Sequence, residues 1–193
     1  MNKPELREIP DLPDEVRESG LNGDLVLFVG SGISKLAGLP LWSELAKNIL
    51  DELLQKNVIN YFELNQLSSL NPRKQLSIAN LLSPDIPLSS LIKEQCEKAN
   101  YESAIYGYLN RIGCACVTTN YDELLSPINI TISDRQHTPT KVRRIIGAER
   151  FYAAYLNVPG TVVHLHGAIS EPLTIVATVV HPSDWTHRIR TLS

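Results

Sequence analysis

The segment that most constrains the fold is residues 25 to 34, Leu-Val-Leu-Phe-Val-Gly-Ser-Gly-Ile-Ser. A short apolar run that breaks into Gly-x-Gly is typical of a buried strand followed by a phosphate-binding turn, because glycines let a pyrophosphate approach the backbone closely. A plain strand-to-helix turn fits the segment about equally well. Lys35 stands where the dinucleotide fingerprint has its third glycine, and the pattern of NTPase phosphate loops is not matched.

Four apolar, β-prone runs predict strands, at residues 24–29, 112–118, 161–165 and 173–180. Helical segments separate them, which predicts an α/β fold with a Rossmann-like parallel sheet and helices on both faces. A single domain over residues 1–193 is expected from the length.

Residues 42–110 predict a mainly helical insertion between the first two strands. It opens with an amphipathic helix that starts at Trp42, and prolines then divide residues 58–108 into two or three shorter helices. A short helical turn is expected at 14–19. Residues 181–193 have little apolar periodicity and are predicted to form a tail.

Composition excludes several classes of function. The net charge is −3 and no basic stripe is present, so we expect no nucleic-acid partner. No apolar run is long enough to span a membrane and no secretory signal is recognisable, which predicts a cytoplasmic protein without membrane contact. Cys96, Cys114 and Cys116 are expected to be buried thiols rather than metal ligands.

Two further polar segments follow predicted strands. Thr118-Thr119-Asn120-Tyr121-Asp122 and His164-Leu165-His166-Gly167 both lie where the carboxyl ends of parallel strands form the ligand crevice of α/β sheets. Alternative roles stay open, because Asn120 and Asp122 also suit a helix N-cap, and His164 and His166 share a sheet face as paired metal ligands do. His166 is well placed for a general base that titrates near neutrality.

In combination these motifs resemble the sirtuin-type NAD-binding domain, in particular the sirtuin-like NAD-hydrolase branch of bacterial anti-phage defence proteins. The turn at residues 30–34 resembles the family's Gly-Ala-Gly-Ile-Ser, and residues 38–42 resemble its Gly-Leu-Pro-x-Trp. Residues 119–122 resemble its Gln-Asn-Ile-Asp loop, and His166-Gly167 resembles its catalytic His-Gly. The four motifs occur in the family's order.

The resemblance implies an NAD glycohydrolase that releases nicotinamide and ADP-ribose. Catalytic roles are implied for Asn120, which orients water or a ribose hydroxyl, and for His166, which acts as base. NAD, as the substrate, is implied to be held by Gly30, Ser31, Gly32, Ile33, Ser34, Thr119 and Asp122. No metal is expected.

Two departures from the family pattern matter. The family's deacylases carry a zinc module with two Cys-x-x-Cys pairs after the catalytic histidine, and this chain has no cysteine after Cys116, which favours hydrolysis over acyl transfer. Only residues 168–193 follow His166-Gly167, so the C-terminal part of the sheet is expected to be truncated. A second copy of the chain or a partner protein is then expected to complete the domain. The alternative from another class is a catalytically idle nucleotide-binding or assembly module.

Overall fold

The computed structural model describes residues 11–98, 104–127 and 142–177. Its elements in chain order are α1 (Asp14–Asn22), β1 (Val26–Val29), α2 (Ser31–Leu36), α3 (Trp42–Gln55), α4 (Tyr61–Ser68), α5 (Pro72–Leu82), α6 (Leu88–Lys98), α7 (Ala104–Ile112), β2 (Ala115–Thr118), β3 (Arg144–Ile146), the 3-10 helices η1 (Ala148–Arg150) and η2 (Ala153–Asn157), β4 (Val162–His164) and the 3-10 helix η3 (Pro172–Thr174). The predicted tail at 181–193 lies outside the described residues.

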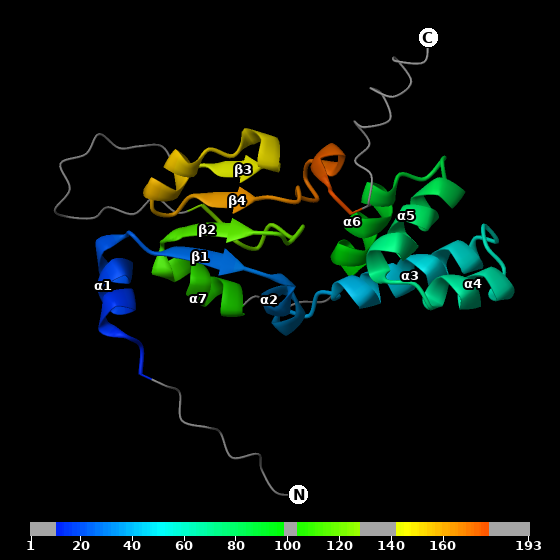
Figure 1. Ribbon diagram of the computed structural model, residues 1–193, viewed down its shortest axis with the longest axis horizontal. Coiled ribbons are helices and arrows are strands. Elements are labelled where there is room, and N and C mark those ends of the chain that lie inside the picture. The colour runs from blue at the N-terminus through cyan, green and yellow to red at the C-terminus, as the bar shows by residue number, and fades with distance from the viewer. Residues whose placement is uncertain (1–10, 99–103, 128–141, 178–193) are drawn as a thin grey trace, which may run out of the picture.

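The four strands form one all-parallel sheet in the order β1-β2-β4-β3, which confirms the predicted Rossmann-like α/β fold. Val29 pairs with Thr118, and Thr118 pairs with His164, so the carboxyl ends of three strands are level with one another. All strands run the same way in Figure 1. The polar segments that follow β1, β2 and β4 therefore meet at one edge of the sheet, as the sequence predicted.

Both faces of the sheet are covered, but by different structures. On one face, Tyr106 of α7 packs with Cys116 and Val162 of the central strands. On the other face, residues of and around η2 pack against Val117 and Val163. Cys114 and Cys116 are buried free thiols, as predicted. Helices on both faces are therefore present, with 3-10 helices serving on the second face.

The insertion begins with α3, which confirms the predicted amphipathic helix. Its apolar side is almost inaccessible to solvent and packs against α4, α5 and α6, so burial of that side holds the four helices together. This cluster lies beyond the carboxyl ends of the strands (Figure 1). Tyr121 after β2 and Ile175 after β4 join its core, so the insertion is packed directly on the loops that carry the predicted site.

Two strand predictions differ from the structure. The short strand β3 was not expected, because two isoleucines after two arginines are too few to show the alternation of a strand. The strand predicted at 173–180 is wrong for its described part: η3 occupies Pro172–Thr174, and 175–177 form no strand. Pro172 begins that 3-10 turn, and the Thr174 hydroxyl donates to the carbonyl oxygen of Glu171 at 2.6 Å. Residues 178–180 lie outside the described part.

The helix boundaries differ in smaller ways. Four helices, α4 to α7, occur where two or three were expected, because Pro72 stands in the first turn of α5 and starts that helix rather than breaking one. The N-terminal helical turn is a nine-residue helix, α1. Over the ranges given above, no helix combines the length and apolar character that a bilayer crossing requires.

Candidate functional site

The glycine turn leaves open space beside its backbone. Gly30 has an extended backbone conformation and precedes α2, which begins at Ser31. A Cβ atom built on Gly30 or on Gly32 would meet no heavy atom within 4 Å, and neither residue has a positive φ. Neither backbone strain nor packing within the described chain therefore requires glycine at these positions.

Gly167 is different, since the fold itself requires it. Its φ is +86°, a region that favours glycine, and a Cβ there would lie 2.3 Å from the carbonyl oxygen of Thr174. The glycine of the His-Gly pair is therefore explained by the close passage of the chain through η3. Gly30 and Gly32 have no comparable explanation.

Asn120 connects the second predicted loop to the glycine turn. Its side-chain amide donates to the carbonyl oxygen of Gly30 at 3.1 Å, and its backbone N–H donates to Thr118 Oγ1 at 3.0 Å. The Thr118 hydroxyl in turn donates to the carbonyl oxygen of Val29 at 2.8 Å. Asn120 Oδ1 is buried and accepts no hydrogen bond within the described part of the chain. Asn120 thus presents a buried acceptor that can take a hydrogen bond from a water molecule or from a ligand.

Asp122 is held in a buried hydrogen-bond network. Its Oδ2 accepts from Ser34 Oγ at 2.7 Å and from the hydroxyl of Tyr106 at 3.2 Å, while Ser34 and Tyr106 lie 3.1 Å apart. Burial raises the pKa of Tyr106, so its hydroxyl stays protonated as a donor. The helix-cap interpretation is wrong, since residues 122–125 form no helix. Asp122 joins the glycine-turn helix to α7 and to the loop after β2.

A small cavity of about 40 Å³ lies against these residues. Its lining from the predicted set consists of Ser31, Ser34, Thr119, Asn120 and Asp122. The insertion supplies another wall, where the rings of Trp42 and Tyr121 lie 5.5 Å apart. A second cavity of about 160 Å³ shares Leu39, Cys96 and Asp122 with the first. Burial raises the pKa of the Cys96 thiol to about 11, so this thiol contributes an apolar wall rather than a nucleophile.

His166 lies two residues beyond β4 and is half-buried. It does not line the cavity that Asn120 lines, and its Nδ1 is buried without a hydrogen-bond partner within the described residues. Val176 N–H donates to its carbonyl oxygen at 2.9 Å, which fixes its backbone. Burial, and to a lesser extent the positive charge of Arg73, lowers the pKa of His166. The imidazole is therefore neutral near pH 7, as a general base must be.

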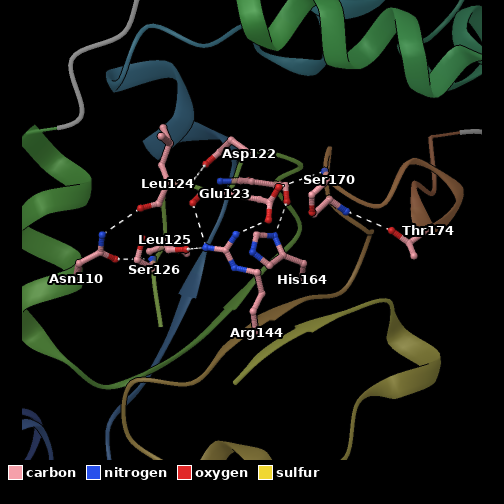
Figure 2. Close-up of polar contacts among 12 residues, drawn as sticks. Asn110, Asp122, Glu123, Leu124, Leu125, Ser126, Arg144, His164, Ser170 and Thr174 are labelled. Atoms are coloured by element: carbon pink, nitrogen blue, oxygen red, sulfur yellow. Dashed lines mark hydrogen bonds and ion pairs between the residues drawn. The ribbon is translucent and has the colours of Figure 1, made fainter. Parts of the chain in front are cut away.

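His164 lies at the end of β4 in the core, and its Nε2, like Nδ1 of His166, is buried without a hydrogen-bond partner within the described residues. It is fully buried, its Nδ1 lies 3.2 Å from the carbonyl oxygen of Asn120, and burial lowers its pKa. Figure 2 shows it beside the ion pair of Glu123 and Arg144, which sequence reasoning missed. In the ranges that the structure describes, no three His, Cys, Asp or Glu side chains are grouped to hold a metal ion, so nothing supports the paired-ligand interpretation of His164 and His166.

The structure brings most of the predicted site residues together, but not all of them. Ser34, Asn120 and Asp122 are joined by hydrogen bonds or by a shared partner, and Ser31 and Thr119 line the same cavity. Ile33 packs into the core beside α7 instead, and His166 stands outside the cavity. Tyr106 was missed, because a tyrosine in a helical run carries no sequence signal for a polar contact. Comparison with protein-family models and with curated proteins finds no match to this chain.

Proposed function

We propose that this protein is an NAD glycohydrolase that cleaves the bond between nicotinamide and ribose. The observation that carries the proposal is the free space at Gly30 and Gly32, together with a cavity that the intervening Ser31 lines with Thr119 and Asn120. Glycines that neither the backbone nor the packing requires are explained if a ligand approaches the backbone there. A pyrophosphate suits such a position, because the backbone N–H groups can point at its oxygens.

The cavity has room for a few water molecules and not for a dinucleotide, so we place the attacking water in it, the reacting ribose at its mouth and the phosphates along the open glycine turn. Asn120 Oδ1, which is buried and unpartnered, accepts a hydrogen bond from a ribose hydroxyl or from the attacking water. The water oxygen bonds to the anomeric carbon as the bond to nicotinamide breaks. The electron pair leaves with the pyridinium ring and neutralises it, while the water proton passes to neutral His166.

The motif resemblance supports the same chemistry and adds a setting. It points to an anti-phage defence effector that acts in the cytoplasm, where hydrolysis of NAD arrests an infected cell.

The test is the variant Gly32→Ala, compared with Asn120→Ala and His166→Ala. Gly32→Ala adds a methyl group to free space in α2, where alanine is the better helix former, so stability is expected to be unchanged or to rise by about 0.5–1 kcal/mol. NAD cleavage, followed by chromatography of nicotinamide and ADP-ribose, is expected to fall at least tenfold, as it should in Asn120→Ala and His166→Ala. Full activity in Gly32→Ala would refute the phosphate position.

A second candidate function is a nucleotide-binding module without turnover. The position of His166 outside the cavity lined by Asn120 favours it. Under this alternative the purified chain binds NAD in a calorimetric titration and Gly32→Ala abolishes the binding, but nicotinamide is never released. Release that His166→Ala abolishes would exclude the module.

A further inference from the structure

The two loops that carry Asn120 and His166 are tied together outside the cavity by the carboxylate of Glu123. Glu123 follows Asn120 by three residues, and Ser170 follows His166 by four. One carboxylate oxygen of Glu123 accepts from the backbone N–H of Ser170 at 3.1 Å, and the other pairs with Arg144. Figure 2 shows this carboxylate between the two loops.

Arg144, which belongs to strand β3, holds the loop after β2 that carries Asn120. It stands at the start of β3, and its Nη2 donates to the carbonyl oxygens of Leu125 at 2.8 Å and of Glu123 at 3.2 Å. A guanidinium suits this task, because its rigid fork of donors can satisfy a carboxylate and two carbonyls together. The two side chains are only 25% and 19% exposed, so the ion pair is shielded from water more than a surface pair is.

Three further contacts to backbone carbonyl oxygens link the loops after β2 and β4 closer to Asn120. Ile169 N–H donates to the carbonyl oxygen of Tyr121 at 3.0 Å, and the Tyr121 hydroxyl donates to the carbonyl oxygen of Val176 at 3.1 Å. His164, from the end of β4, contacts the carbonyl oxygen of Asn120. The loop after β2 therefore cannot shift without carrying the loop after β4 with it or breaking these contacts.

We propose that Glu123 and Arg144 are positioning residues that hold the loop of Asn120 at a fixed separation from the loop of His166. This inference rests on the proposed NAD hydrolysis, in which the two residues must act on one ribose. Neither Glu123 nor Arg144 lines the 40 Å³ cavity, although Glu123 lines the neighbouring 160 Å³ cavity. Both carboxylate oxygens of Glu123 are already engaged, one by Ser170 and the other by Arg144, so we assign this ion pair to holding the loops rather than to contacting the substrate. Small displacements of reacting groups, on the order of 1 Å, reduce rates by roughly a hundredfold.

The experiment compares Arg144→Met and Arg144→Lys with Arg150→Met as the control. Arg150 pairs with Glu171 at 2.7 Å, in the loop after β4. This pair is more exposed than the Glu123–Arg144 pair, and within the described residues it makes no contact with the loop after β2. Arg144→Met is expected to lower kcat of NAD cleavage by about 10–100-fold while KM changes by less than about threefold. Arg144→Lys, which keeps the charge but loses the fork, is expected to recover part of kcat. Arg150→Met is expected to keep kcat.

Amide hydrogen exchange, read by mass spectrometry on the full chain, tests whether the ion pair holds the two loops and does not depend on NAD cleavage. Arg144→Met is expected to speed exchange in segments 119–126 and 166–172 together, while α3 and α5 are unaffected. The inference would be overturned by an unchanged kcat in Arg144→Met or by an equal loss of kcat in Arg150→Met. Faster exchange in only one of the two segments of Arg144→Met would overturn it as well. A wild-type chain that cleaves no NAD would instead refute the proposed function, and coupled exchange of the two segments would still decide whether the Glu123–Arg144 pair ties the loops.

Discussion

The hydrogen bonds of Tyr106 can be removed without changing the shape of its side chain. Tyr106→Phe deletes a hydroxyl that lies 3.2 Å from Asp122 Oδ2 and 3.1 Å from Ser34 Oγ, in a side chain that is 1% exposed. A hydrogen bond to a charged group contributes about 1.5–3 kcal/mol. Ser34 still donates to Asp122 at 2.7 Å in the variant, so the carboxylate keeps one partner and the loss should stay within that range.

In a domain of this size, such a loss lowers the melting temperature by roughly 3–12 °C. Urea unfolding followed by circular dichroism gives the change in the free energy of unfolding. Tyr152→Phe is the control, because Tyr152 is 64% exposed and its ring contact with Tyr155 does not need the hydroxyl. The control is expected to change stability by less than about 0.5 kcal/mol. Equal effects of the two variants would refute the idea that the Asp122 network holds α2, α7 and the loop together.

Three shorter predictions follow from the same structure. Gly167→Ala should destabilise the protein markedly, as measured by thermal unfolding, because its Cβ would collide with the backbone of Thr174. The value of kcat/KM for NAD cleavage should rise with pH as His166 loses its proton, with an inflection below the ordinary histidine pKa of 6.5. Arg73→Gln should move that inflection to higher pH, because it removes a positive charge that lowers the His166 pKa. Burial of neutral His164 should stabilise the fold above pH 6.5 and lose that contribution as the pH falls below it, since the unfolded chain then binds the extra proton. Urea unfolding near pH 7 and near pH 5 should show this acid sensitivity in the wild type and less of it in His164→Gln.

The sequence was most informative where glycine or polar residues directly follow an apolar strand. An apolar run followed by glycines or by Asn-x-Asp marks the end of a buried strand, and parallel pairing then brings such ends together without further information. For this reason β1, β2 and β4 and the meeting of Gly30 with Asn120 were predictable. The long amphipathic pattern of α3 was equally clear, because fourteen residues provide several helical turns of evidence.

Tertiary contacts between distant residues were not predictable in the same way. Arg144 reaches Glu123 only because β3 adds to the sheet beside β4, and a three-residue strand carries too little periodicity to be recognised. Tyr106 reaches Asp122 only because α7 packs on that face of the sheet. In both cases the polar partner is chosen by packing, so each residue taken alone has the appearance of an ordinary arginine or core tyrosine.

Two glycines that the sequence presents as equals have different structural settings. Gly32 and Gly167 each belong to a motif of the resemblance, yet only Gly167 is explained by a positive φ and by a backbone neighbour at 2.3 Å. Selection for folding alone therefore accounts for Gly167 but leaves Gly32 unexplained. Gly107 of α7 has equally open space beside its backbone, so open space alone does not identify a ligand. For Gly32, the proposed phosphate contact supplies an explanation, and Gly32→Ala tests it. The substitution that harms folding and the substitution that harms NAD binding should consequently be different ones.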